Sequence, residues 1–355
     1  MSANFDLANL ALQAVCPGNE LLYDDKGMPS VMVKIPKMTY AELGMGTSRD
    51  VHPAFIVNDT EVSAIYISKY QNVIYDDRAY SMPGVDPCSA NFDTAFNACA
   101  TKGSGWHLMT RMEWGLLVRW CQNNGVMPRG NNSYGRCGGD VGYKAIPSFT
   151  RNNRYAYRTA TGTGPLTWYH DQSPSGIADL CGNVSEWMGG IRTVGGELQV
   201  LADNNGADSA HSQASAGAEW RAINAFNGSL IVPDGSGTTP DSIKLDFING
   251  KLTYATTITD PNRGKHTISF ADIVCGTSIG DDAKQLLQTL GLMMFDSNEL
   301  FASHTCIFYN DSDEKYWQSG GDYTYSSYGL ATFLGFSARG HSEPQLGFRA
   351  AFAEI

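Results

Sequence analysis

Long runs of helical periodicity are scarce in this 355-residue chain, and that scarcity restricts the folds it can adopt. The clearest helical segment is residues 110–123, where apolar side chains recur every three or four positions and Thr110 and Glu113 form a capping box. Residues 91–102 predict a second helix. Because 38 glycines are spread along the chain, most other residues are expected in loops. The sequence therefore predicts an α+β fold with few helices, short strands and many long loops, and long loops in a compact domain tend to be functional.

Five short segments have the apolar, β-branched character of strands. They are residues 31–35, 62–68, 198–202, 243–248 and 346–352. The chain shows no internal repeat, so we expect these strands to belong to a single non-repetitive fold.

Charge and hydropathy argue against two classes of partner. Lys and Arg total 25 and Asp and Glu total 36, a net charge of −11. An acidic chain repels phosphate backbones, so no nucleic-acid partner is expected. No stretch approaches the ~20 apolar residues that cross a bilayer, so no membrane span is expected. Residues 1–16 lack the basic start and long apolar run of a secretion signal and are predicted to form a short amphipathic element.

The eight cysteines do not form a recognisable metal or disulfide pattern. No two lie within four residues of each other, which excludes a CxxC-type zinc site. They are too sparse for a disulfide scaffold, so most are expected to be buried free thiols. One or two bridges, such as Cys88 with Cys99, remain open.

Three motifs occur in order along the chain. Residues 105–114 read GWHLMTRMEW, residues 179–187 read DLCGNVSEW, and residues 346–350 read LGFRA. They resemble the G-x-R-L-P-T-x-x-E-W, D-x-x-G-N-V-x-E-W and G-F-R motifs of formylglycine-generating-enzyme-like domains, also called the sulfatase-modifying-factor subclass. This resemblance implies a C-type-lectin-like fold over residues 31–355, with residues 1–30 as an N-terminal extension that attaches the protein or builds a homo-oligomer.

Most residues of these motifs are expected to serve the fold. Trp114 and Trp187 are bulky apolar residues beside glycines and are predicted to lie in the core. Gly182 and Asn183 suit a tight turn with positive φ. Arg349 is predicted to hold a buried carboxylate or backbone carbonyls.

The second motif also carries a metal prediction. The resemblance implies that catalytic relatives bind calcium through the residues that match Asp179, Gly182, Val184 and Glu186. Hard oxygen ligands from one turn suit calcium, which would be structural here; no cofactor is otherwise required. The alternative is that Glu186 caps a local turn.

The residues that catalysis would need are missing. The oxidases of this family bind copper through two cysteines near the C-terminus, and residues 337–349 contain none; Cys275 and Cys306 are 31 residues apart. Iron-dependent relatives need an N-terminal histidine cluster, but the first histidine is His52 and no HxxxH run exists. No GxSxG elbow is present. We therefore expect no enzyme activity, with a formylglycine-generating-enzyme-like oxidase kept as an alternative.

The segment 309–328, YNDSDEKYWQSGGDYTYSSY, has an unusual composition. Tyr, Ser, Asp and Gly supply 14 of its 20 residues, and Tyr is about fivefold denser than in the whole chain. Antibody binding loops use this mixture because Tyr offers a large contact area at low entropy cost, while Ser and Gly adapt. The alternative is that these rings are core residues of the fold.

The C-terminal pattern also resembles the variable region of proteins that retroelements diversify on a lectin-like scaffold, here about residues 305–349. In such families error-prone copying at adenines changes selected codons. The framework residues are Trp317, Gly320, Gly321, Tyr323, Gly329, Leu330, Phe333, Gly347, Phe348 and Arg349. The residues predicted to face the ligand are Tyr316, Gln318, Asp322, Tyr323, Tyr325, Ser326, Ser327, Tyr328, Thr332, Gly335, Phe336, Ala338, Arg339 and His341. Tyr323 appears in both sets because it stands where Trp is common, and Tyr328-Gly329 stands where Ala-Gly is common.

Taken together, the sequence predicts a non-catalytic receptor-binding protein with a diversified C-terminal surface. Its expected partner is a protein or glycan on a target cell. The resemblance and the missing secretion signal favour a phage or prophage particle as the carrier. A purely structural virion protein is the second alternative.

Overall fold

The computed structural model describes residues 7–151, 155–295 and 299–355, and it shows an α+β protein of few helices, many short strands and long loops. One sheet has five strands in the order β1-β2-β5-β23-β8. These are β1 (Asn19–Tyr23), β2 (Pro29–Pro36), β5 (Ala64–Ser68), β23 (Ala350–Ala353) and β8 (Trp106–Leu108). The last strand of the chain thus lies between strands from its first third.

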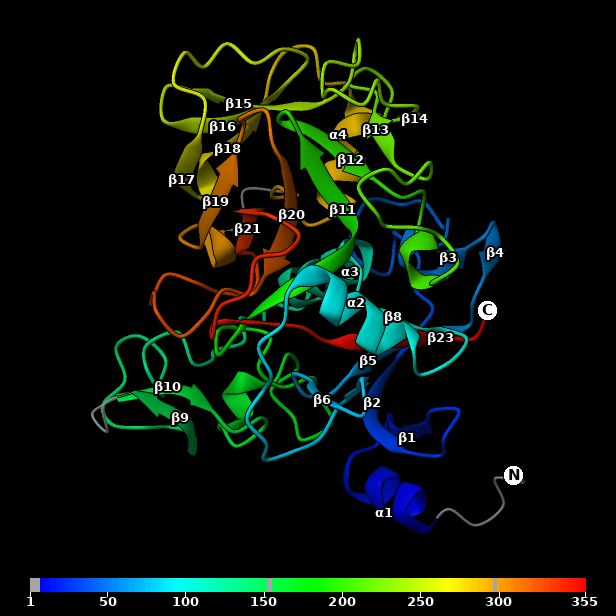
Figure 1. Ribbon diagram of the computed structural model, residues 1–355, viewed down its shortest axis with the longest axis vertical. Helices are drawn as coiled ribbons and strands as arrows, with labels where there is room; N and C mark the ends of the chain where they lie inside the picture. Colours follow the sequence, from blue (N-terminus) through cyan, green and yellow to red (C-terminus); the bar gives the residue numbers. More distant parts are fainter. Residues whose placement is uncertain (1–6, 152–154, 296–298) are drawn as a thin grey trace.

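A larger sheet forms the other end of the molecule (Figure 1). Its main path is β17-β19-β21-β20-β11-β12-β15-β16-β18, with β13, β14 and β22 attached at the side. Their bounds are β11 (Ser185–Val194), β12 (Glu197–Val200), β13 (Arg221–Ile223), β14 (Leu230–Ile231), β15 (Lys244–Ile248), β16 (Lys251–Ala255), β17 (Lys265–Ser269), β18 (Ile273–Cys275), β19 (Thr305–Tyr309), β20 (Glu314–Ser319), β21 (Phe333–Ser337) and β22 (Leu346–Gly347).

Three two-stranded sheets complete the strands of the described residues. They pair β3 (Ile56–Val57) with β4 (Thr60–Glu61), β6 (Val73–Tyr75) with β7 (Arg78–Tyr80), and β9 (Pro147–Arg151) with β10 (Tyr155–Thr159). Short 3-10 turns lie at Pro53–Phe55, Leu166–Trp168, Asn205–Ala207, Phe270–Asp272 and Glu299–Phe301.

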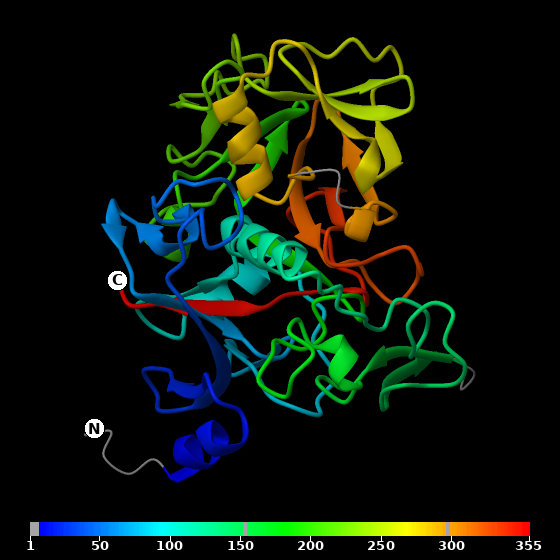
Figure 2. The same cartoon turned by 180° about the vertical axis from the view of Figure 1, so that it is seen from behind.

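Both predicted helices are confirmed. They are α2 (Phe92–Ala100), capped by Asn91, and α3 (Arg111–Asn123), which begins with the predicted Thr110–Glu113 capping box. Helix α1 (Leu7–Val15) lies within residues 1–16, where a short amphipathic element is predicted, and the structure adds α4 (Asp281–Thr289). Helices α2 and α3 lie in the middle of the molecule, between the two large sheets, in both views (Figures 1 and 2).

Helix α3 is buried on nearly every side and organises the core. Trp114 on α3 is fully buried and its indole Nε1 donates to Leu330 O at 3.0 Å. Trp187 is equally buried and donates to Ala90 O at 2.8 Å, so the core prediction for both tryptophans is confirmed. Gly115 lets α4 pack directly on α3, because a Cβ there would lie 2.2 Å from a carbonyl oxygen of α4.

The predicted strand 346–352 is divided between the two sheets. Residues 346–347 form β22, which pairs in parallel with β11, while residues 350–353 form β23 in the five-stranded sheet. Phe348 and Arg349 bridge them and are both fully buried. The chain therefore crosses from one sheet to the other at the GFR motif.

The five-stranded sheet begins earlier than the predicted boundary between residues 30 and 31. Strand β1 pairs with β2 along its whole length, so residues 19–23 and 29–30 belong to the sheet. Helix α1 precedes it and buries none of its own side chains. None of the helices among the described residues is long and apolar enough to cross a membrane.

All eight cysteines are free thiols, five of them buried and three half-buried. Cys88 and Cys99 form no bridge in this structure.

Candidate functional site

The fourteen residues predicted to face a ligand divide into two groups of seven. The exposed or half-buried group is Tyr325, Ser326, Ser327, Phe336, Ala338, Arg339 and His341. The buried group is Tyr316, Gln318, Asp322, Tyr323, Tyr328, Thr332 and Gly335. For the buried group the prediction of side chains pointing to solvent is wrong, because β20 lies inside the larger sheet between β11 and β21 and the turn after it folds back onto the core. Tyr328 differs from the other six because it lines the pocket described below.

Ring contacts explain the burial of the tyrosines. The Tyr316 and Phe92 ring centroids are 4.3 Å apart, which places Tyr316 in the core beneath α2. The Tyr323 ring lies edge-on to Tyr157 at 5.1 Å. Tyr328 joins a small apolar cluster. Much of the tyrosine-rich segment therefore stabilises the fold.

Residues 325–327 form an exposed turn between β20 and β21, which we call the tyrosine turn. Tyr325 is 60% exposed and is the one exposed tyrosine of residues 309–328; its ring centroid lies 5.2 Å from that of Tyr328. The Tyr328 N–H donates to Tyr325 O at 2.9 Å and closes the turn. The side chains of Tyr325 and Ser326 are thus available for contact with another molecule, and the exposed Ser327 hydroxyl also accepts a hydrogen bond from Thr305 Oγ1 at 2.8 Å.

The backbone of the tyrosine turn is held from two sides. The Asn132 side-chain amide donates to Ser326 O at 3.1 Å and to Tyr328 O at 2.8 Å. On the other side, the Thr305 N–H donates to Ser327 O at 3.0 Å. Peptide carbonyls, which every residue type has, accept these three bonds, so they persist when the side chains of the turn change; only the bond from Thr305 Oγ1 to Ser327 Oγ depends on a side chain of the turn.

A pocket of about 440 Å³ opens beside the tyrosine turn, and we call it the turn pocket. One wall is formed by residues 326–328; the other combines parts of residues 127–138 with Cys181, Ser303 and His304. The sequence analysis assigned no helix or strand to residues 127–138. No local signal could have identified Asn132, because it lies 194 residues from Ser326 in the chain.

His304 is a buried titratable group that lines the turn pocket. Its Nδ1 accepts the Ala331 N–H at 3.2 Å, and burial lowers the pKa of the imidazole to about 4. The ring is therefore neutral at pH 7. Since Nδ1 is an acceptor, the single ring proton lies on Nε2.

The four residues predicted to bind calcium converge on one atom, the Gln71 side-chain Nε2. It lies 3.1 Å from Asp179 O, 3.2 Å from Gly182 O, 3.1 Å from Val184 O and 3.0 Å from Glu186 Oε1. These are hydrogen-bond lengths, longer than the ~2.3–2.6 Å of calcium–oxygen bonds. An amide group thus takes the place in which the resemblance implies a cation.

We call these four oxygens the oxygen cage. The hydrogen-bond network determines which end of the Gln71 amide faces it. The Thr159 N–H donates to Asn183 Oδ1 at 2.8 Å, so the Asn183 nitrogen must point the other way. That nitrogen donates to Gln71 Oε1 at 2.9 Å. Gln71 Nε2 consequently faces the cage.

Arg349 has the structural role predicted for it. Its Nε and Nη2 donate to the two carboxylate oxygens of Glu186, both at 2.9 Å, and both side chains are buried. Glu186 is therefore paired within the core rather than capping a local turn. Among residues 7–151, 155–295 and 299–355, no group of three or more His, Cys, Asp or Glu side chains is arranged to hold a metal ion.

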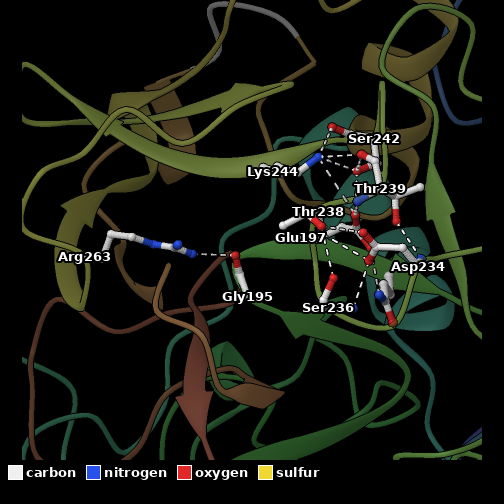
Figure 3. A network of polar contacts seen from close by, with 10 residues as sticks. Gly195, Glu197, Asp234, Ser236, Thr238, Thr239, Ser242, Lys244 and Arg263 are labelled. Atoms are coloured by element: carbon white, nitrogen blue, oxygen red, sulfur yellow. Dashed lines mark hydrogen bonds and ion pairs between the residues drawn. The ribbon is translucent and has the colours of Figure 1, made fainter.

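A second polar network lies beyond the β11–β12 hairpin (Figure 3). The buried Glu197 carboxylate accepts the Thr239 N–H at 3.0 Å and the Ser242 hydroxyl at 2.7 Å. Lys244 donates to Thr239 O at 2.8 Å and to Ser242 Oγ at 2.7 Å. Because these groups satisfy one another, the network holds the loop before β15 onto the sheet.

The oxygen cage predicts how Gln71→Ala will behave. The substitution removes the donor shared by four oxygens, so we expect the free energy of unfolding to fall by about 2–3 kcal/mol in urea titrations. Millimolar calcium chloride should raise the melting temperature of the variant, because three carbonyls and a carboxylate then surround an open space, while leaving the natural protein unchanged. Magnesium chloride is the control for ionic strength. Equal stabilisation of both proteins by calcium would show that Gln71 does not fill the cage in solution.

The lowered pKa of His304 predicts that the free energy of unfolding depends on pH. Its folded pKa of about 4 lies below the ordinary 6.5, so the unfolded chain binds the proton more readily between these values. The free energy of unfolding should therefore fall as pH drops from 6.5 towards 4. In His304→Asn the slope should be shallower by up to about 1.4 kcal/mol per pH unit. Urea titrations at several pH values measure the slope, and parallel curves for the two proteins would contradict this.

Comparison with known proteins identifies no family for this chain. No family model matches it, and no curated protein matches it. Among solved structures, PvdO from Pseudomonas aeruginosa is similar over 96% of this chain and 99% of its own, with 13% identity and a TM-score of 0.38. Treponema denticola variable protein 1 is similar over 95% and 100%, with 12% identity and a TM-score of 0.29. Both TM-scores are too low to carry an argument about fold or function.

Proposed function

We propose that this chain is a non-catalytic ligand-binding protein that uses the tyrosine turn and the turn pocket as its binding surface. The observation that supports this most directly is the contrast within one turn. Its backbone is tied to the core through Asn132 and Thr305, while the side chains of residues 325–327 are exposed. A rigid backbone with an exposed tyrosine loses little entropy on binding.

The same contrast supports a surface that retroelements diversify on a C-type-lectin-like scaffold. Substitutions at Tyr325, Ser326 or Ser327 would leave the core unchanged, because peptide carbonyls accept the anchoring bonds. Substitutions at buried Tyr316 or Tyr323 would disturb packing. We therefore restrict the proposed variable positions to the exposed and half-buried group of seven.

The proposed target is a cell surface, and the proposed carrier is a phage or prophage particle. Helix α1 supports attachment or self-association, because its Leu7, Leu10 and Val15 side chains are exposed. Several copies on one particle would convert weak single-site binding into avidity.

Binding tests this proposal directly. In a triple variant, Tyr325→Ala with Ser326→Ala and Ser327→Ala, we expect affinity for a recognised cell type to fall about tenfold or more, because truncation of an exposed interface tyrosine costs ~1–2 kcal/mol. Labelled protein on a panel of bacterial cells, read by flow cytometry, measures the affinity. Tyr75→Ala is the matched control, since Tyr75 is 69% exposed on the β6–β7 hairpin. Equal binding by the natural protein and the triple variant would refute the placement.

The surrounding DNA tests the diversification. We expect a near-copy of the codons for residues 305–349 beside a reverse-transcriptase gene, differing mainly at adenines. Across sibling genomes the codons for residues 325–327 should vary, while those for Trp317 and Gly320 should not. Invariance of the whole segment would favour a structural virion protein instead.

A further inference from the structure

We propose that the turn pocket receives the carboxylate of an acidic side chain presented by a protein partner. This inference rests on the function proposed above and adds the chemistry that the pocket recognises. It follows from the hydrogen-bond donors around the pocket, from the charge of its lining and from the character of its rim.

His304 supplies the first donor. The side chain is 7% exposed and lines the pocket. Since Nδ1 accepts the Ala331 N–H, the neutral ring carries its proton on Nε2, and Nε2 has no hydrogen-bond partner among the described residues. Gly329 leaves room for this edge of the ring, because a Cβ there would lie 2.3 Å from Nε2. This N–H is not sealed from solvent, so it is free to donate to a ligand acceptor in the pocket.

Arg129 supplies the charge. It lines the pocket, and its Nη2 donates to Asp140 Oδ1 at 2.6 Å, an ion pair that holds the guanidinium in place from outside the lining. The pKa of Arg129 is raised, first by a hydrogen bond with the Cys137 sulfur and then by Asp140. The guanidinium therefore lies beside Cys137, another lining residue.

The remaining polar groups of the lining do not offset this bias toward donors. Asn132 is already used, since its amide nitrogen donates to two carbonyls and its oxygen accepts the Gly138 N–H at 2.8 Å. The serines of the lining add hydroxyls that can donate. Among the described residues the lining contains no Asp or Glu, although the chain carries a net charge of −11. A guanidinium, an imidazole N–H and hydroxyls together complement a carboxylate.

The rim favours a protein partner over a free anion or an acidic sugar. Tyr325 is 60% exposed beside the pocket, and Met127, in its lining, is 41% exposed. Exposed tyrosine and methionine around a pocket that binds a charge are typical of protein–protein contacts, in which apolar contact surrounds one buried polar anchor.

Cys137 allows the pocket to be tested without a partner. Its thiol is half-buried in the lining, so it can be alkylated either by iodoacetate, which carries a carboxylate, or by neutral iodoacetamide. We expect the ratio of the iodoacetate rate to the iodoacetamide rate to be about fivefold higher at Cys137 than at Cys275, a half-buried thiol outside the pocket. Peptide mass spectrometry of partly alkylated folded protein measures both sites at once. Equal ratios would overturn the proposal.

A matched pair of variants separates the pocket from general electrostatics. Arg129→Gln should lower the ratio at Cys137 to that of Cys275. Arg136→Gln removes the same charge one residue from Cys137, at an exposed position that does not line the pocket, and should leave the ratio unchanged. Equal effects of the two substitutions would refute a specific carboxylate site.

Protection experiments distinguish the source of the carboxylate. N-acetylglutamate, as a mimic of an acidic side chain, should slow alkylation of Cys137 by iodoacetamide more than glucuronate or inorganic phosphate does. Stronger protection by glucuronate or phosphate would overturn the protein partner. Because none of these measurements uses cells, their failure is distinguishable from a failure of the cell-binding tests.

Discussion

The buried pair of Glu186 and Arg349 connects the two large sheets, and the site depends on that connection. Glu186 lies on β11 of the larger sheet, whereas Arg349 precedes β23 of the five-stranded sheet. The guanidinium also donates from Nη1 to Ser68 O at 2.7 Å and from Nη2 to Ala178 O at 2.9 Å. One cation thus satisfies a carboxylate and two carbonyls from three segments. Removing one partner of such a pair typically costs ~3–5 kcal/mol, because a buried charge is left alone.

The loop that precedes Glu186 is hydrogen-bonded to the segment that anchors the tyrosine turn. Gly182 has a φ of +75°, and a Cβ there would lie 2.2 Å from Asn131 O, so only glycine allows the two segments to approach. The Asn183 N–H donates to Asn131 O at 2.7 Å, and the Gly182 N–H donates to Gly320 O at 2.9 Å. Asn131 precedes Asn132, whose amide anchors the turn. The DLCGNVSEW motif therefore helps to position residues that are far apart in the sequence.

At the oxygen cage the resemblance predicted the position of the oxygens but not the group that they surround. The resemblance named four residues, and the structure does bring their oxygens to one point. What occupies that point could not be read from the motif, because Gln71 lies more than a hundred residues earlier. An amide donor compensates for the same oxygens that would otherwise need a cation.

By itself the sequence determined several local features: helices α2 and α3, the capping box of α3, a minority of the strands, the buried tryptophans and the pairing of Arg349 with a carboxylate. These follow from apolar spacing, capping chemistry and side-chain size, which act over a few residues. Only the tertiary structure decided which tyrosines are buried. Tyr316 and Tyr325 have the same side chain in one short segment, yet Tyr316 packs under α2 while Tyr325 stands in solvent. The turn pocket is also decided only by the tertiary structure, because its walls come from segments that meet only when the sheets pack together.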